Sequence, residues 1–322
     1  MIGVDIDISQ VPDSSWNSRL LNSKMGTIYQ TVENSEYQKI LSDFDHDFIK
    51  FLHPNGEIIG QLIISKTPRQ GRLKKLKLTK LPFIQDLHRW TYGPVIFDTN
   101  FADEIIHSLK NYFKTKKIKA YGSIHPLSVP YFKNLSTLFQ IQNWSTFLID
   151  LSIDRDSLWN NLEKHSARKN IERSLKKNVI VKQITKSELL DYFNLLKYTK
   201  EKAGVHIDFL DTETMWSKFN KIGFDIFMAY YQDKPVGGLG ISHFNSYLNE
   251  WGVARSDIDY KEKLYANDLI KWKVIEWGKK KNYNYFDLTG VNLSPANSKE
   301  EGILRYKKKW GGQQIDLSII RS

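Results

Sequence analysis

The chain has 322 residues, of which 41% are hydrophobic and 13% aromatic, which is enough apolar material for packed interiors and excludes a disordered chain. Its length favours two domains or two fused subdomains over a single core. It contains no cysteine, which excludes disulfides, zinc–thiolate sites and thiol nucleophiles. A formal net charge of +11 and a pI near 9.4 favour an anionic partner, such as nucleic acid, a phosphorylated ligand or a membrane surface.

The N-terminal segment Met1–Asp7 is acidic and lacks the basic and apolar regions of a signal peptide. No apolar run approaches the roughly 20 residues that span a bilayer as a helix. We therefore expect a cytoplasmic protein that can touch the inner face of the membrane through its positive charge.

The first half of the chain predicts a helix, a hairpin, a strand, a helix and a strand. The hairpin turn contains Asn55-Gly56, a pair that tolerates the positive φ of a tight turn. These elements are a helix at 35–42, strands at 47–52 and 58–64, a strand-like segment at 92–95, a helix at 102–116 and a strand at 118–123.

The second half predicts the same order of elements with different residues. They are helices at 187–202 and 212–222, strands at 224–230 and 235–241, a strand at 247–253, a helix at 260–280 and a strand at 283–288. A repeated order without repeated identities predicts duplicated α/β subdomains. We place them at 1–152 and 153–322.

A basic helical segment is expected where the two halves join. Asp154 begins this run, and its apolar side consists of Trp159, Leu162, Ile171 and Leu175. One face is cationic, with Lys169, Arg173, Lys176 and Lys177 at helical spacing. Such a face is more often simply solvated, but it could also follow the phosphates of a nucleic acid. A second basic run, between Arg72 and Lys80, has no clean period and allows the same two interpretations.

The common enzyme signatures are missing: there is no Gly-rich Lys loop, dinucleotide fingerprint, nucleophile elbow or zinc-protease motif. The eight histidines lack the spacing of metal ligands, so we expect no metal site. An amine nucleophile would have to lose a proton, because its ordinary pKa is near 10. Glu250, in the strand at 247–253, and Asp287, at the end of the closing strand, could accept it. Carboxylates in such positions also serve structural networks.

The segment Gly302–Gly312 carries a short cationic helix that ends in glycines. On this helix Leu304, Lys307 and Lys308 would share one face, and Arg305 and Lys309 another. Lys307 would lie beside apolar residues, where a partly buried ammonium needs an anionic partner. Such a lysine can bind phosphate or stabilise a developing oxyanion. The alternative is an ordinary basic helix end that complements the helix dipole.

Three segments of the second half, Tyr265–Trp272, Tyr285–Gly290 and Gly302–Gly312, share a pattern with a known enzyme family. They resemble the FemABX family of peptidoglycan-bridge aminoacyltransferases, whose closing motif reads aromatic, Lys, two variable residues, aromatic, Gly. In this chain the motif occupies 306–311. Three earlier segments also fit: Gly26–Thr31 is similar to the family's opening strand, Tyr92–Val95 to its Gly-Pro turn, and Arg168–Ile171 to the basic helix that opens the second subdomain.

The resemblance implies a fold of two fused GNAT-like (acetyltransferase-type) subdomains, each a mixed sheet flanked by helices. It also implies an aminoacyl-tRNA donor, a phosphate-bearing cell-envelope acceptor with a free amine, and no bound cofactor. In the family, the lysine after the first aromatic residue of the closing motif is tied to the reacting centre. That position is Lys307 here, preceded by Tyr306, and we group Tyr306 and Arg305 with the substrate-binding residues.

The resemblance further implies an acceptor site lined by a tyrosine near the start of the long helix. Tyr260 and Tyr265 both match, and the sequence does not choose between them. Arg168 is expected to hold the phosphates of the acceptor.

The closing motif here departs from the family pattern, because Tyr306 and Trp310 replace the usual phenylalanines. No long heptad stretch for a helical arm is present either. Two alternatives therefore stay open. One is an acyl-CoA-dependent N-acyltransferase that acts on an amino sugar or polysaccharide precursor, and the other is a non-catalytic RNA-binding protein.

Overall fold

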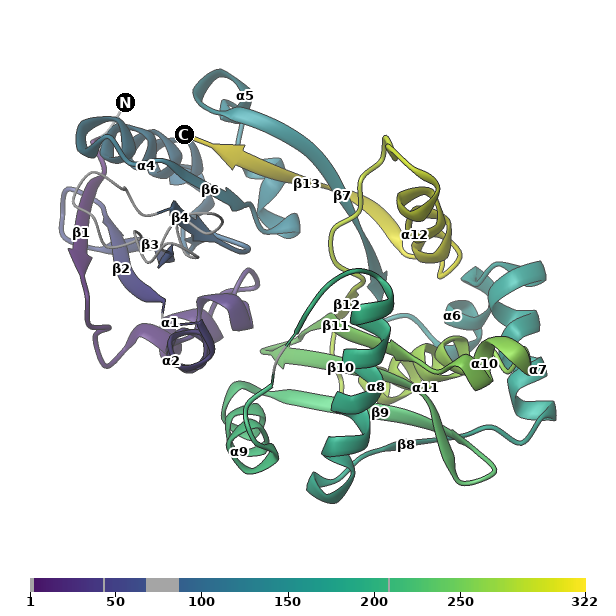
Figure 1. Cartoon of the computed structure of the whole chain (residues 1–322). Coiled ribbons are helices and arrows are strands. Elements are labelled where there is room, and N and C mark those ends of the chain that lie inside the picture. Colours follow the sequence, from purple (N-terminus) through teal and green to yellow (C-terminus); the bar gives the residue numbers. More distant parts are fainter. Residues whose placement is uncertain (1–2, 43, 68–86, 208) are drawn as a thin grey trace. The chain divides into compact units, whose positions relative to one another are not determined.

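The computed structural model describes residues 3–42, 44–67, 87–207 and 209–322 (Figure 1). The chain folds into two compact units. Unit 1 comprises Met1–Ser145 together with Asp316–Ser322, and unit 2 comprises Thr146–Ile315. We expected one boundary, between residues 152 and 153. In this division the chain passes from unit 1 to unit 2 between Ser145 and Thr146 and returns to unit 1 at Asp316. The basic run between Arg72 and Lys80 lies outside the described residues.

Unit 1 is built on a mixed sheet whose strands lie in the order β1-β2-β3-β4-β6-β13. Its elements are β1 (Asp5–Ser9), α1 (Trp16–Leu21), η1 (Ile28–Gln30), α2 (Val32–Ser42), β2 (Asp45–Leu52), β3 (Ile58–Thr67), β4 (Leu87–Trp90), β5 (Val95–Ile96), η2 (Thr99–Phe101), α4 (Ala102–Lys116), β6 (Ala120–Ser123), η3 (Pro126–Tyr131), α5 (Leu135–Leu138) and the end of β13 (Gln313–Arg321). The β2–β3, β3–β4 and β6–β13 pairs are antiparallel, and the β4–β6 pair is parallel.

Unit 2 is built on a mixed sheet in the order β7-β12-β11-β10-β9-β8. Its elements are the end of β7 (Gln140–Asp150), α6 (Arg155–Asn161), η4 (Lys164–Arg168), α7 (Lys169–Lys176), β8 (Ile180–Gln183), η5 (Lys186–Glu188), α8 (Leu189–Lys202), α9 (Thr212–Ile222), β9 (Phe224–Tyr231), β10 (Lys234–Phe244), β11 (Tyr247–Arg255), α10 (Asp257–Lys261), α11 (Ala266–Lys280), β12 (Tyr285–Asp287) and α12 (Ser298–Lys308). The β9–β10, β10–β11 and β12–β7 pairs are antiparallel, and the β11–β12 pair is parallel.

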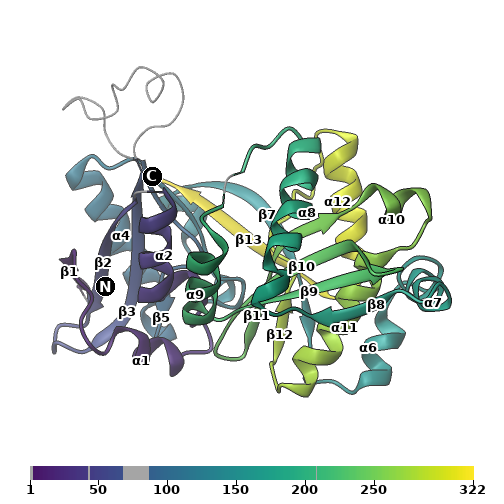
Figure 2. The same ribbon diagram turned by 60° about the horizontal axis from the view of Figure 1, so that its bottom comes forward.

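The two units repeat one topology, which confirms the predicted duplication. Each has a hairpin, a third antiparallel strand and a parallel neighbour that is reached through a long helix, α4 or α11. Strands β7 and β13 each begin in one unit and end in the other (Figure 2). One detail of the prediction was wrong. The order of elements matched the segment at 92–95 to the strand at 247–253, but the counterpart of β11 is β4. Both strands pair antiparallel with the hairpin and parallel with the next strand. The segment at 92–95 instead contributes Val95 to β5, which pairs with β3.

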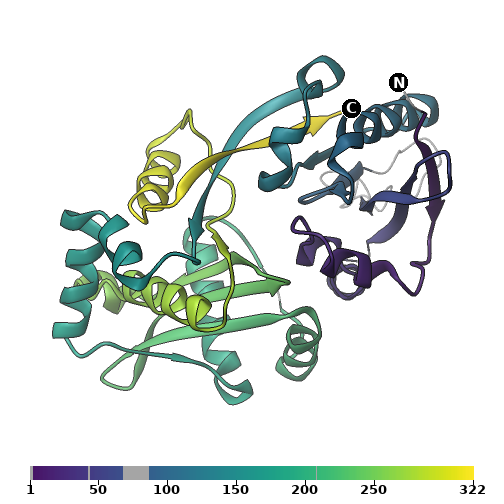
Figure 3. The ribbon, with the colours of Figure 1, turned by 180° about the vertical axis from the view of Figure 1, so that it is seen from behind.

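In unit 2 the helices α8 and α11 cover opposite faces of the sheet. A Cβ built on Gly237 of β10 would lie 2.9 Å from Asn267 of α11, and one on Gly238 would lie 2.9 Å from Tyr192 of α8. Since successive strand residues point to opposite faces, the two helices lie on different sides. Helix α8 is in front of the strands in Figure 1, and α11 is in front of them in the view from behind (Figure 3).

The long helix expected at 260–280 is interrupted. Helix α10 ends at Lys261 and α11 begins at Ala266, and the intervening Lys263 and Tyr265 have left-handed backbone conformations, with φ of 49° and 57°. Asp259 accepts the backbone N–H of Ala266 at 2.8 Å, so its carboxylate closes the N-terminus of α11. The apolar period continues across this break, which is why the sequence pattern predicted one helix.

The segment Gly26–Thr31 forms the short helix η1, where the family resemblance predicted a strand. The side chain of Gln30 explains the difference. It accepts the backbone N–H of Ile63 at 2.6 Å and donates to the carbonyl of Thr91 at 2.9 Å. A buried side-chain amide therefore takes the backbone partners that a strand would otherwise supply.

The join between the halves forms three short helices. Asp154 caps α6 by accepting the backbone N–H of Ser157 at 2.8 Å. The inner face of the following helices consists of Ala167, Ile171 and Ser174, so Leu175, which we expected on the apolar side, is exposed. The predicted cationic face of α7 is confirmed as solvent-exposed. Among the described helices, none combines the length and apolar character needed to cross a membrane.

Buried His125 should make unit 1 sensitive to acid. Burial lowers the pKa of this imidazole from 6.5 to about 3, so between these pH values the unfolded chain binds a proton that the folded chain does not. Stability should therefore fall as the pH drops through this window. In His125→Asn, the pH dependence of urea unfolding should be shallower, since Asn can still accept the N–H of Leu127 as an N-cap but does not titrate. The exposed control His165→Asn should leave the slope unchanged, and equal slopes for all three proteins would contradict the prediction.

Candidate active site

Helix α12 places Lys307 against the loop that leaves β12. Asn297 caps this helix by accepting the backbone N–H of Glu300 at 3.0 Å. The helix predicted at 302–309 is confirmed, and it begins earlier, at Ser298. Lys307 is 8% exposed, whereas Lys308 beside it is exposed. The predicted burial of Lys307 is therefore confirmed, and the expected placement of Lys308 on the same face is wrong.

The Lys307 ammonium contacts only neutral oxygens in the described part of the chain. Its Nζ lies 3.1 Å from the carbonyl oxygen of Thr289, 3.0 Å from that of Gly290 and 3.4 Å from the hydroxyl of Thr289. Burial lowers the pKa of Lys307 below 10.5 and the positive charge of Lys271 adds to this, against the opposing charges of Glu250 and Asp287. Within the described part of the chain, two backbone carbonyls and a hydroxyl are thus the direct partners of this ammonium.

Asp287 holds the turn that supplies these carbonyls. It is fully buried, and its Oδ1 accepts the backbone N–H of Thr289 at 2.7 Å and the hydroxyl of Thr146. Its Oδ2 accepts the hydroxyl of Tyr247 at 2.8 Å. Thr289 adopts a left-handed conformation, with φ of 61°, which this hydrogen bonding stabilises. Both carboxylate oxygens of Asp287 are therefore occupied by hydrogen bonds within the described structure.

Glu250 forms a buried ion pair with Lys271. Their atoms Oε2 and Nζ are 2.6 Å apart, and the two side chains are 8% and 1% exposed. The Lys271 ammonium also lies 4.7 Å from the ring centroid of Tyr306 and 5.3 Å from that of Trp310. The sequence did not single out Lys271, because a lysine on the buried side of an apolar helix gives no periodic signal of its own.

A second buried pair joins α12 to α11. The Nζ of Lys309 lies 2.7 Å from both carboxylate oxygens of Asp268, which also accepts a hydrogen bond from Asn170 at 2.7 Å. The same ammonium is 4.4 Å from the ring centroid of Tyr306. Burial raises the pKa of Tyr306 well above 10, and the negative charges of Asp268 and Glu250 add to this. Tyr306 is therefore a neutral phenol between two ammonium groups.

These groups form one charge-balanced set, which we call the buried lysine cluster. It consists of Lys271, Lys307 and Lys309 with Glu250, Asp268 and Asp287. Two of its lysines contact a carboxylate directly, and Lys307 does not. Among the described residues, no group of three or more His, Asp or Glu is suited to hold a metal ion.

The closing motif has a structural reason at each of its defined positions. Tyr306 packs between the ammonium groups of Lys271 and Lys309, Lys307 binds the carbonyls after β12, and Trp310 is 1% exposed in the core. Gly311 has a φ of 70°, and a Cβ there would lie 2.3 Å from the carbonyl oxygen of Asn161. Only glycine satisfies both conditions.

The other residues proposed from the sequence lie apart from these contacts. Tyr260 is 55% exposed and lies under the guanidinium of Arg255, and Tyr265 contacts Arg173. Arg168 donates to the carbonyl of Leu162 at 3.1 Å, and Arg305 is exposed on α12. In the described part of the chain, none of these predicted binding residues hydrogen-bonds to Lys307.

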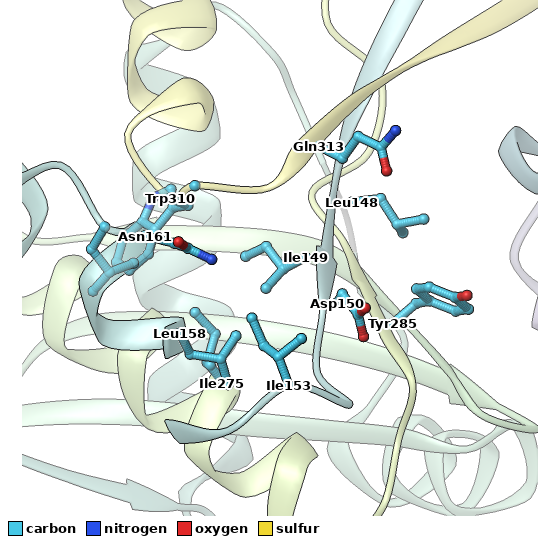
Figure 4. Close-up of a pocket in the computed structure, with 12 residues that line it drawn as sticks. Leu148, Ile149, Asp150, Ile153, Leu158, Asn161, Ile275, Tyr285, Trp310 and Gln313 are labelled. Atoms are coloured by element: carbon cyan, nitrogen blue, oxygen red, sulfur yellow. The ribbon is translucent and has the colours of Figure 1, made fainter. Parts of the chain in front are cut away.

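Two hollows flank the end of α12. The first, of about 260 Å³, has a lining of mixed polar and apolar side chains and lies beside Trp310, with Asn161 at one side and Asp150 and Tyr285 at the other (Figure 4). The second, of about 510 Å³, is lined by Arg305 and Lys309 among others. Lys309, and with it the buried lysine cluster, therefore borders the second hollow.

No family model matches the chain, and no curated protein matches it. Several solved structures do match the chain. FemX matches with a TM-score of 0.70 and 13% identity over 97% of this chain and 96% of its own. The chain has a FemX-like fold. L-PGS from Bacillus licheniformis matches with a TM-score of 0.56 and 14% identity over 98% and 93% of the two chains. A tandem GNAT protein from the clavulanic acid biosynthesis pathway matches with a TM-score of 0.52 and 10% identity over 99% and 97%.

These matches confirm the predicted architecture of two fused GNAT-like subdomains. The structural likeness extends over nearly the whole of each matched chain. At 10% to 14% identity the likeness concerns the fold, so the chemistry has to be argued from the side chains of this FemX-like chain.

Removal of Lys271 should destabilise the protein much more than removal of its exposed neighbour Lys273. Lys271→Met leaves the buried Glu250 carboxylate without its partner, which should cost about 3–5 kcal/mol. Lys273→Met breaks an exposed pair with Glu276 in the same helix and should cost less than about 1 kcal/mol. Urea unfolding of both variants at pH 7 measures the difference, and equal losses would contradict it.

Proposed function

We propose that this protein is an aminoacyltransferase. It would join an amino acid carried by tRNA to an amine of a peptidoglycan precursor or a similar cell-envelope acceptor. The observation that carries the proposal is the Lys307 ammonium, which is buried and, among the described residues, hydrogen-bonded only to neutral oxygens. The FemX-like fold and the resemblance of the closing motif support it.

The reaction needs a group that stabilises a developing negative charge. The acceptor amine attacks the ester carbonyl of the donor, and a tetrahedral oxyanion forms. The attack forms the C–N bond of the product amide, and the ester C–O bond breaks when this intermediate collapses. Over the whole reaction the amine loses a proton and the ribose oxygen of the tRNA gains one. A preorganised cation in a site of low dielectric constant is effective at the oxyanion, and Lys307 would supply it.

Glu250 is better placed than Asp287 to accept the proton of the attacking amine. Only its Oε2 is bonded in the described part of the chain, to Lys271, whereas both oxygens of Asp287 are occupied, Oδ1 by the turn after β12 and Oδ2 by Tyr247 of β11. A carboxylate with a free oxygen beside the cation can take the amine proton during attack. Asp287 would act on the reaction through Thr289 and Gly290.

The N-terminus of α11 favours aminoacyl-tRNA over acyl-CoA as the donor. Proteins commonly bind a pyrophosphate such as that of CoA at a helix N-terminus, through free backbone N–H groups and the helix dipole. In α11 the carboxylate of Asp259 already accepts the N–H of Ala266 and would repel a phosphate there. An acyl-CoA-dependent reaction on an amino sugar is the alternative, and a comparison of the two donors by mass spectrometry of the products decides between them. A cytoplasmic location, with contact to the inner membrane face, is part of the proposal.

Removal of the Lys307 ammonium should slow transfer without unfolding the protein. We expect Lys307→Met to lower kcat about 100-fold, since this is the usual effect of losing one oxyanion-stabilising group. Lys308→Met removes the same charge from the adjacent exposed position and should leave kcat within about twofold. Transfer from charged tRNA to lipid-linked or nucleotide-linked acceptors measures both. If the two variants transfer equally well, Lys307 has no role at the reacting centre.

The pH profile should report the protonation of Lys307. Only the charged form can stabilise an oxyanion, so kcat/KM should fall as the pH rises through the lowered pKa of Lys307, below the ordinary value of 10.5. Lys307→Arg keeps the charge to much higher pH, because the guanidinium has a pKa above about 12. The alkaline fall in kcat/KM should therefore move to higher pH in that variant. An unchanged fall would assign it to another group.

A further inference from the structure

A cationic surface of unit 2 is left unused by the proposed chemistry. It consists of the outer face of α7 and the loop between α10 and α11, and we call it the α7 surface. Its six exposed cations are Lys169, Arg173, Lys176, Lys177, Lys261 and Lys263. Asp257 lies close enough to Lys261 to interact with its charge, but its described ion pair is with Lys202, and Glu172 and Glu262 form no ion pair with these cations among the described contacts. The surface therefore keeps most of its positive charge.

Hydrogen bonds and packing hold the two parts of this surface together. Lys177 donates to the backbone carbonyl of Glu262, and the guanidinium of Arg173 lies 5.6 Å from the ring centroid of Tyr265. Helix α7 also packs against α11, with Ile171 fully buried. The cations of the helix and of the loop are thus parts of one structured surface.

The loop is held in a conformation that non-glycine residues rarely adopt. Lys263 and Tyr265 have φ values of 49° and 57°, and neither position carries the glycine that would relieve the strain. Each such residue costs about 1 kcal/mol or more and persists where the surroundings hold it. Lys261, at the end of α10, and Lys263, in this loop, are both exposed.

The surface suits a polyanion better than a lipid bilayer. A helix that inserts into a membrane needs an apolar face directed at the lipid. The apolar face of α7 is buried against α11, and Leu175 is its one large apolar side chain exposed in the described structure. Lys169, Arg173 and Lys176 instead follow one side of the helix over about 10 Å. Such a row can neutralise several phosphates of a nucleic-acid strand.

We propose that the α7 surface binds the sugar–phosphate backbone of the donor tRNA, a choice of RNA that rests on the proposed function. The contact is electrostatic and independent of base sequence. It serves to hold the donor on unit 2, which also contains Lys307 and the buried lysine cluster.

The test compares two variants that lose the same charge. The first carries Lys169→Gln, Lys176→Gln, Lys261→Gln and Lys263→Gln, whose exposed side chains make no hydrogen bond among the described contacts. The control carries Lys114→Gln, Lys116→Gln, Lys117→Gln and Lys119→Gln, at or after the exposed end of α4 in unit 1. Circular dichroism and thermal melting check that both variants fold. Fluorescence anisotropy with uncharged tRNA, over a series of salt concentrations, gives Kd.

We expect the α7 variant to bind tRNA at least about tenfold more weakly than the wild type, with a shallower dependence of log Kd on log salt concentration. The α4 control should change Kd by less than about threefold. Equal weakening by both variants, or no tRNA binding by the wild type, would overturn the proposal. So would binding to vesicles of anionic lipid that depends on the same four lysines while tRNA binding does not.

Lys307→Met separates this inference from the proposed function. It should keep wild-type affinity for tRNA, because Lys307 is buried and is not one of the exposed cations of the α7 surface. If tRNA binds through the α7 surface but no amide product forms with any acceptor, the surface stands and the proposed reaction fails. If transfer occurs but the α7 variant binds tRNA normally, the reaction stands and the surface assignment fails.

Discussion

The candidate site depends on the hydrogen bonds of one buried carboxylate, that of Asp287. It accepts from Thr146 on β7, Tyr247 on β11 and the backbone N–H of Thr289, so it ties neighbouring strands of unit 2 to the turn after β12. That turn directs two carbonyls at Lys307. A fully buried carboxylate that accepts from neutral donors is stabilised by a positive charge nearby. Lys307 supplies such a charge to Asp287 without hydrogen-bonding to it in the described structure.

The buried lysine cluster extends the same principle to the closing segment. Lys271 and Lys309 are each compensated by a carboxylate of unit 2, and Tyr306 lies between their ammonium groups. Burial of such pairs is costly unless every group is satisfied, so the cluster specifies one arrangement of α12 against α11. The position of Lys307 follows from that arrangement.

Much of the fold could be predicted from periodicity and turn chemistry. Helices α4 and α9 have the bounds that the pattern predicted, and both hairpins lie where turn residues separate apolar runs. The break between α10 and α11 could not be predicted, because it depends on Asp259 reaching Ala266 and on the left-handed Lys263 and Tyr265. The sequence also did not predict that β7 and β13 each begin in one unit and end in the other. Strand partners that are distant in sequence leave no local signal.

The sequence by itself determined the duplicated α/β architecture and the cationic character of the chain, because these follow from apolar period and composition, and its helical spacing predicted that Lys307 is buried. Only the tertiary structure decided which charges accompany Lys307. Lys271 and Asp268 lie on the inner side of α11, and their partners come from β11 and α12. A sequence pattern reports which face of one helix is apolar. It does not report which distant carboxylate meets a lysine there, since that depends on how strands and helices pack in three dimensions.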